Sequence, residues 1–429
     1  MTGEALKYAR ESGAGATLTF RESQKIEINF EFNRLKGIQN TESLQFTAQA
    51  IKGGKLGVAV STKAGGEKEV LDRAIRLCEY GAPANYVFPD PEPSEKPAVY
   101  SEEVASLGLK EMLRVGEDLS AFLKSLHPDV NGSVTVSKAV FREGIANTNG
   151  LEATWDRTVL LLMAISSLVD GQNLVDLWDY HVSTVLNWDV EAMKEEIRSR
   201  FDLARKNVPV KTDAYPVLFT PFAFRDLISP ILACLDGRAV TIGVSPFKGR
   251  LEEQVFSPQL TVIEDGLMEG GLESRMYDAQ GVRCRRTPLI EKGVLREYLL
   301  DLETARKLGR EPIGTGGVGG IEPGNVIVPG GSLSKESLLT GMKRGIVVEN
   351  TMGAWAGNPF SGQVSGNIAM GFLVEDGELV GRVKDCMFSL NIFTHLKDHL
   401  VALSRETKNF GITLPYALID NVSVTGKKG

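Results

Sequence analysis

The chain has 429 residues, of which 42% are hydrophobic and 24% charged, so it can form two or more domains with substantial cores. Its 48 basic and 55 acidic residues give a formal net charge of −7, which disfavours direct contact with nucleic acid or with an anionic membrane. The four cysteines form no C-x-x-C pair, which argues against a zinc ribbon or a disulfide scaffold. With no signal peptide and no apolar run of ~20 residues, we expect a cytoplasmic protein.

The first 82 residues are predicted to form an α+β domain. The first ten residues have the pattern of an amphipathic helix, and apolar residues at helical spacing over 67–80 predict a second one. Between them, alternating or β-rich runs predict an antiparallel meander with strands at 17–20, 26–32, 46–51 and 56–60. Gly53 and Gly54 lie between the last two runs, where a two-residue hairpin needs positive φ.

Residues 83–100 contain five prolines and are predicted to be a linker. The middle α+β segment, 101–208, is expected to pack with the first domain. Its pattern predicts helices over 107–126 and 189–206, the latter capped by Asn187, and strands at 134–136, 153–155 and 159–162.

Residues 212–429 are richer in glycine, and helices are predicted there over 334–344 and 391–405 among short strands. The glycine content, 45 residues in the whole chain, is typical of many tight turns between strands. The fold class that we predict is therefore α+β, with an N-terminal α/β meander followed by a larger β-rich C-terminal domain.

Residues 314–319 match the dinucleotide-binding pattern G-x-G-x-x-G. That pattern binds pyrophosphate only between a strand and the N-terminus of a helix, and the flanking residues fit neither element. We therefore interpret the segment as a structural glycine loop.

His395 and His399 are four residues apart, which on a helix places both imidazoles on one face and makes them weak candidate metal ligands. A metallopeptidase helix needs a glutamate beside the first histidine, and position 396 is leucine. We favour a solvated or partner-facing pair. Cys234 and Cys386 lie in apolar surroundings that predict packed thiols. Taken alone, the residues assemble no catalytic site.

Three segments of the C-terminal half, 288–299, 322–331 and 371–378, resemble the TldD/PmbA family in order and spacing. The N-terminal helix and residues 53–59 also fit, so the resemblance spans nearly the whole chain. It implies a place in a cytoplasmic peptidase that pairs a catalytic subunit, TldD, with a similar subunit, TldE or PmbA, and that trims or degrades peptides. The family also carries an older association with modulation of DNA gyrase, which no DNA-binding feature of this chain supports.

The catalytic type of the family carries H-E-x-x-x-H on a helix, and a late cysteine completes its zinc site. In this chain Ser229 and Cys234 stand at the two histidine positions and Pro230 at the glutamate, and no cysteine follows Cys386. The resemblance therefore implies a TldE/PmbA-type subunit with no catalytic residues and no cofactor of its own. Zinc is expected in a TldD-type partner.

We accordingly expect a non-catalytic subunit that pairs with a TldD-type chain in a heterodimer, or with itself, and holds a peptide through backbone hydrogen bonds at a strand edge. Candidate peptide-contact residues are Asn325, Asn358, Ser361 and Ser365. Relatives often have Ser-Gly-Asp-Phe-Ser at 361–365, where this chain has Gln and Val in the middle, and often an acidic residue at position 280, which is Gln280 here. Roles tied to those acidic positions do not transfer.

Two other functions stay open. One is a stand-alone homodimeric protein that binds peptides or regulates a process. The other is an independent metal hydrolase that uses His395 and His399.

Overall fold

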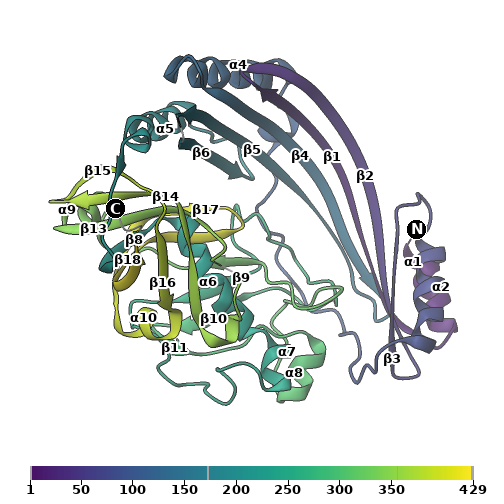
Figure 1. The fold of residues 1–429 in the computed structure, drawn as a ribbon. Helices are drawn as coiled ribbons and strands as arrows, with labels where there is room; N and C mark the ends of the chain where they lie inside the picture. The colour runs from purple at the N-terminus through teal and green to yellow at the C-terminus, as the bar shows by residue number, and fades with distance from the viewer. Residues whose placement is uncertain (1, 172, 355, 427–429) are drawn as a thin grey trace.

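The computed structural model describes residues 2–171, 173–354 and 356–426, whose strands form a six-stranded and a twelve-stranded sheet. The strands up to Ser183 belong to the first sheet and those from Asn207 onward to the second. Figure 1 shows the first sheet as an arch of long, curved strands beside the second. The predicted α+β class, with a larger β-rich C-terminal part, is confirmed. Among the helices that the structure describes, none combines the length and apolar character needed to cross a membrane.

The six-stranded sheet is antiparallel throughout, in the order β3-β2-β1-β4-β5-β6. Its strands are β1 (Gly15–Glu31), β2 (Arg34–Lys52), β3 (Lys55–Ser61), β4 (Asn131–Asn147), β5 (Glu152–Asp170) and β6 (Asn173–Ser183). Gly53 and Gly54 have φ values of 59° and 71°, as the hairpin predicted between β2 and β3 requires.

One face of this sheet is apolar and covered by helices. These are α1 (Thr2–Glu11), α2 (Glu67–Leu77) with a 3-10 turn (Cys78–Tyr80), α3 (Glu102–Ser106), α4 (Leu109–Leu126) and α5 (Val190–Arg205). Leu18 of β1 packs in the same buried cluster as Leu71 of α2, and Ile28, further along β1, in the cluster of Leu119 of α4. Because side chains alternate along a strand, residues such as Thr17 face the other way, toward the C-terminal part.

The twelve-stranded sheet mixes parallel and antiparallel pairs. Its strands are β7 (Asn207–Val208), β8 (Asp213–Phe219), β9 (Val262–Asp265), β10 (Arg286–Glu291), β11 (Val294–Leu295), β12 (Asn325–Ile327), β13 (Arg344–Met352), β14 (Gln363–Glu375), β15 (Glu378–Val383), β16 (Met387–Asn391), β17 (Leu400–Asn409) and β18 (Ile412–Thr425). The helices of this part are α6 (Pro221–Leu235), α7 (Gly237–Ile242), α8 (Leu302–Leu308), α9 (Lys335–Thr340), α10 (Ile392–Asp398) and a 3-10 turn (Pro359–Ser361). The apolar faces of α6, α7, α8 and α10 close one large core, and Leu338 of α9 packs in a smaller cluster with Leu218.

The polar face of the first sheet contacts a loop of the second domain. The Arg157 guanidinium of β5 donates to the carbonyl of Leu272, and the Gln49 amide of β2 donates to the carbonyl of Ala279 at 2.7 Å. Glu143 of β4 orients Arg157, whose Nη2 lies 3.2 Å from the carboxylate. These contacts fix the position of the C-terminal loops on the arch.

Some predicted elements differ from the structure. The strands expected at 17–20 and 26–32 are one continuous strand, β1, because β2 and β4 pair along both sides of it. Asp189, rather than Asn187, caps α5 by accepting a hydrogen bond from the Ala192 N–H. The helix predicted over 334–344 is confined to Lys335–Thr340.

The helix predicted over 391–405 is wrong in its second half. Only Ile392–Asp398 is helical, and Leu400–Asn409 is strand β17. Pairing with the long strand β18 wins over the local helical pattern there, as tertiary contacts often do.

Gly57 allows α2 to lie directly on β3. A Cβ at this position would stand 2.0 Å from the carbonyl oxygen of Ala74 in α2. We therefore predict that Gly57→Ala lowers the free energy of unfolding by about 1–3 kcal/mol, as overpacked sites do, and lowers the thermal midpoint. Gly37→Ala is the matched control, because a Cβ on that strand glycine meets no atom within 4 Å. Equal thermal midpoints for the two variants would contradict this packing.

Candidate functional site

Helix α6 carries the three positions at which the sequence departs from the zinc motif. Thr220 caps the helix and Pro221 opens it, and the helix continues through Pro230 to Leu235. Proline has no N–H, so the carbonyl of Asp226 receives no helical hydrogen bond from position 230. The residues of the predicted motif thus lie on one helix, as the resemblance implies.

A groove of about 170 Å³ lies along the C-terminal half of α6, and we call it the α6 groove. Its lining residues come from the helix and from the loop and strand opposite: Ser229, Pro230, Ala233, Ala354, Gly357, Asn358, Pro359, Gln363 and Val364. The Asn358 side chain accepts a hydrogen bond from the Phe360 N–H at 3.0 Å and so shapes the 3-10 turn at the edge of the groove.

The groups at the three motif positions do not suit zinc. Ser229 is exposed, and its hydroxyl donates to the Arg225 carbonyl at 2.9 Å. Cys234 is buried, and its thiol donates to the Pro359 carbonyl at 3.6 Å. Burial raises the pKa of this thiol to about 12, so it is protonated at neutral pH, whereas zinc binds the thiolate. In the part of the chain that the structure describes, no three His, Cys, Asp or Glu side chains gather in a way that could hold a metal ion.

The candidate peptide-contact residues lie in different places. Asn358 caps the 3-10 turn and Ser361 is its last residue, whereas Ser365 is exposed on β14, opposite Ser389 of β16. Asn325 is 1% exposed, and its amide nitrogen donates to the Asp265 carbonyl and to the Ser274 hydroxyl, each at 2.8 Å. The structure therefore places Asn325 inside the fold, where a peptide cannot reach its side chain.

His395 and His399 lie near each other at the end of α10, with ring centroids 5.2 Å apart. Nε2 of His395 lies 3.2 Å from the carbonyl oxygen of Asn421, and Nδ1 lies 3.3 Å from the backbone nitrogen of Asn391. Nδ1 also lies 3.0 Å from the carbonyl oxygen of Asn391. Main-chain groups thus use both nitrogens of His395.

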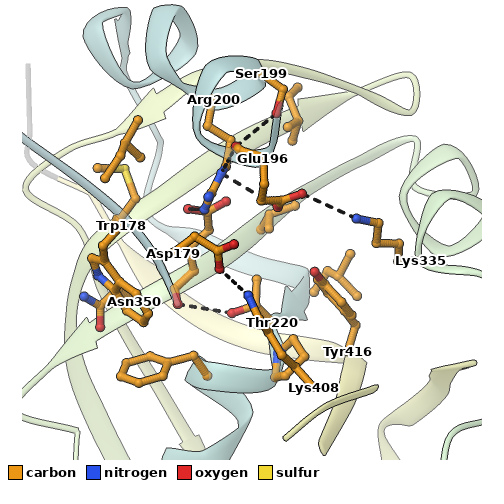
Figure 2. A pocket seen from close by; sticks show the side chains of 18 of the residues that line it. Trp178, Asp179, Glu196, Ser199, Arg200, Thr220, Lys335, Asn350, Lys408 and Tyr416 are labelled. Atoms are coloured by element: carbon orange, nitrogen blue, oxygen red, sulfur yellow. Dashed lines mark hydrogen bonds and ion pairs between the residues drawn. The ribbon is translucent and has the colours of Figure 1, made fainter. Parts of the chain in front are cut away.

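A second cavity, of about 240 Å³, opens between the two domains, and we call it the junction cavity (Figure 2). Sequence reasoning did not find it. Its apolar wall is aromatic, formed by Trp178 and Tyr180 of β6, Phe222 of α6, Phe410, and Tyr416 of β18. The rings of Trp178 and Phe222 meet edge to face with centroids 4.6 Å apart.

Ion pairs between the two domains cross the junction cavity (Figure 2). Arg200 of α5 lies 2.9 Å from Glu349 of β13, and Asp179 of β6 pairs with Lys408 of β17. Burial raises the pKa of Glu349, and the charge of Arg200 opposes that shift. These charges come from four segments that are far apart in the sequence, so no local pattern predicts the cavity. The one local signal is the run Trp178-Asp179-Tyr180, which places two aromatic rings beside a carboxylate.

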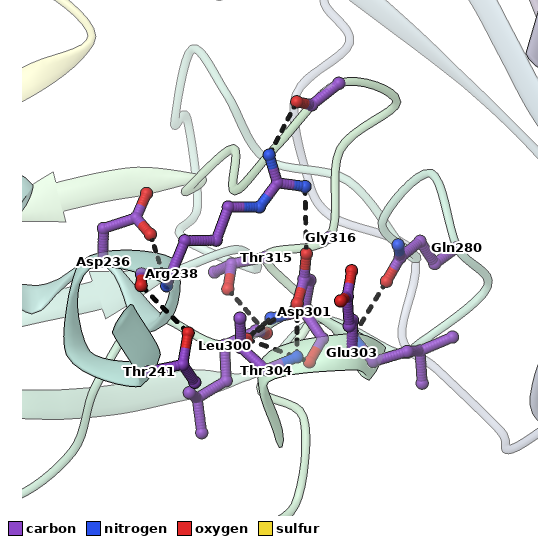
Figure 3. A network of polar contacts seen from close by, with 12 residues as sticks. Asp236, Arg238, Thr241, Gln280, Leu300, Asp301, Glu303, Thr304, Thr315 and Gly316 are labelled. Carbon is purple, nitrogen blue, oxygen red and sulfur yellow. Dashed lines mark hydrogen bonds and ion pairs between the residues drawn. The ribbon is translucent and has the colours of Figure 1, made fainter. Parts of the chain in front are cut away.

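The glycine loop at 314–319 is structural, as predicted. Arg238 donates to the Gly319 carbonyl at 2.9 Å and pairs with Asp301, the cap of α8, at 3.4 Å (Figure 3). Thr315 donates to the Leu300 carbonyl at 3.0 Å, and the Gln280 carbonyl oxygen accepts from the Leu302 N–H at 2.9 Å. The loop contacts the start of α8 through side chains, and strand β12 rather than a helix follows it.

Comparison with known families agrees with this architecture. The sequence model described as the PmbA/TldA metallopeptidase C-terminal domain matches residues 212–426, half of the chain. The chain belongs to the PmbA/TldD family. The matched span contains the α6 groove, α10 and the glycine loop of this family member.

Relatives extend the likeness over the full length. An uncharacterised protein of Methanocaldococcus jannaschii is 25% identical over 412 residues, 92% of each chain. The metalloprotease PmbA of Escherichia coli O157:H7 is 32% identical over 177 residues, which are 41% of this PmbA/TldD-family chain and 38% of that protein. The crystal structure of TldE from Thermococcus kodakarensis has the same fold, with a TM-score of 0.91 over 99% of both chains at 21% identity.

The Cys234 thiol should be chemically inert in the folded protein. Because it is buried and its pKa is raised to about 12, we predict that iodoacetamide at pH 7.5 leaves it unmodified until the protein is unfolded. Mass spectrometry of digested protein measures this. Ser229→Cys is the control, since it places a thiol at an exposed position of the same helix and should be labelled in the native state. Labelling of both sites at similar rates would show that Cys234 is accessible.

Proposed function

We propose that this chain is a non-catalytic subunit of a cytoplasmic TldD/TldE-type zinc metallopeptidase complex, in which it helps to bind and process peptides. The observation that carries the proposal is the donor set of the α6 groove. A hydroxyl, a proline ring and a protonated thiol stand at Ser229, Pro230 and Cys234, where the catalytic type of the family has two imidazoles and a carboxylate. Activation of water by zinc needs three protein ligands and a base, so that step is assigned to the partner.

The α6 groove could still hold a peptide backbone. Strand β14 pairs with β16 from Gln363 to Asn367, while its pairing with β13 begins only at Asn367. In the described chain, residues 363–366 therefore have a ladder partner on one side, and Gln363 and Val364 line the groove. Addition of an extended peptide to such an edge uses backbone hydrogen bonds and is tolerant of sequence. This supports a subunit that binds peptide without cutting it.

The proposal predicts that activity belongs to the pair. The purified chain should bind a TldD-type protein from the same organism in a stable complex, seen by size-exclusion chromatography with light scattering. Peptide cleavage, followed by mass spectrometry, should need both chains and should stop when the motif glutamate of the partner is changed to glutamine. Zinc-dependent cleavage by this chain alone would overturn the proposal, as would a homodimer that never engages such a partner.

A second prediction concerns metal content. The chain purified alone should contain substoichiometric zinc, because the α6 groove lacks suitable donors and both nitrogens of His395 are used by the main chain. Elemental analysis by mass spectrometry measures this after dialysis. His399→Ala should leave the metal content, and the activity of the pair, unchanged. One zinc per chain that is lost in His399→Ala would instead support the independent hydrolase.

A further inference from the structure

The junction cavity and the α6 groove are joined by two elements. On α6, Phe222 lines the cavity and Ser229 the groove, and residues seven apart share a helix face about 10 Å apart along the axis. Beside it, Asn350 on β13 lines the cavity, and Ala354, just beyond that strand, lines the groove. Asp226 of α6 accepts a hydrogen bond from Thr351, which holds the helix and the strand together between the two hollows. The two hollows therefore lie about 10 Å apart along α6, on either side of this hydrogen bond.

Basic side chains of the protein lie against rings of the aromatic wall of the junction cavity. The guanidinium of Arg225 lies 4.4 Å from the ring centroid of Phe222, and the ammonium of Lys408 lies 5.6 Å from that of Tyr180. Ring faces attract cations through their quadrupole, most strongly where water is excluded. The same wall also accepts aliphatic groups, because apolar residues such as Leu218 complete it.

The charged groups of the cavity leave an excess of carboxylate. The lining contains five acidic side chains, Asp176, Asp179, Glu196, Glu336 and Glu349, and three basic ones, Arg200, Lys335 and Lys408. Among these acids, Asp179 and Glu349 have side chains that are only 13% and 14% exposed, and Glu349 uses one oxygen, Oε2, for Arg200. Its Oε1 accepts no hydrogen bond within the described chain. A cation that enters the cavity thus gains a carboxylate oxygen. Nη2 of Arg200 is also buried at this cavity and has no hydrogen-bond partner within the described chain.

We propose that the junction cavity is a specificity site for a basic side chain, lysine or arginine, of a peptide whose backbone lies in the α6 groove. The aliphatic stem contacts the aromatic wall, and the charged end reaches Glu349. An extended peptide advances about 3.3 Å per residue, so the basic residue stands about three positions from the residue beside Ser229. The inference rests on the proposed peptide-binding role and names the substrate class that this role would select.

Binding of labelled peptides to the full chain tests the charge preference. Fluorescence anisotropy would compare a neutral, flexible eleven-residue peptide with lysine, norleucine or glutamate at one position. Norleucine keeps the aliphatic stem and removes the charge. We expect the lysine peptide to bind about tenfold more tightly than the norleucine peptide, and the glutamate peptide to bind most weakly. Equal affinities for lysine and norleucine would overturn the proposal.

Substitutions test whether the preference for lysine over norleucine arises in the junction cavity. Glu349→Gln should reduce the lysine-to-norleucine ratio to about one, while Glu195→Gln, on the same helix as Arg200 but outside the cavity, should leave it unchanged. Because Glu349 is buried, its variant needs a thermal unfolding control. Asp176→Asn with Glu336→Gln changes only exposed acids at the rim and should lower the ratio without affecting folding. If the lysine-to-norleucine affinity ratio stays unchanged in both Glu349→Gln and the double variant, the lysine preference arises elsewhere and the proposal is overturned.

Cross-linking tests the spacing. Peptides with a photoreactive benzoylphenylalanine three residues from the lysine should cross-link to the groove segments 229–233 or 357–364, identified by mass spectrometry. Cross-links that stay outside these segments would contradict the arrangement. If no TldD-type partner binds but the lysine preference persists, the proposed complex fails and this inference stands. If the pair cleaves peptides without regard to lysine, the complex stands and this inference fails.

Discussion

The hydrogen bond from Arg157 to the carbonyl of Leu272 is the contact on which the arrangement of the two domains most depends. It joins the polar face of the arch to the long loop that leads into the glycine-rich part of the second domain. Glu143 holds the guanidinium in place, and the indole N–H of Trp155 donates to the other oxygen of Glu143 at 3.0 Å. A buried guanidinium needs such a carboxylate, since an unpaired one would be costly. The loop, and with it the glycine segment, is positioned by this network.

Much of the fold could be predicted from sequence because its local patterns are strong. The apolar periods of 107–126 and 189–206 identified helices α4 and α5 within two residues, and the Gly53-Gly54 pair identified the hairpin between β2 and β3. The lengths of the strands could not be predicted, because β1 and β4 continue through polar residues that only pairing on both sides keeps extended. The prediction for the β17 segment was wrong for the same reason, because the strand is formed by pairing with β18, which follows after a turn.

The candidate site was predictable only in part. Ser229, Pro230 and Cys234 were found because they lie within six residues of one helix, where a motif and its loss are both visible in the sequence. The junction cavity was missed because its charges come from both domains, with Glu349 149 residues away from its partner Arg200. Asn325 shows the opposite error: its place in a recognisable segment said nothing about its burial among Asp265 and Ser274.

Strand β5 has a mechanical consequence. Arg157 contacts the second domain directly, and Ile165, eight residues further on, pairs with Trp178, whose ring packs on Phe222. The two contacts are thus about 27 Å apart on one strand. A strand paired on both sides resists bending, so it acts as a stiff lever between them. Widening the junction cavity would therefore either strain the arch or loosen the Arg157 contact.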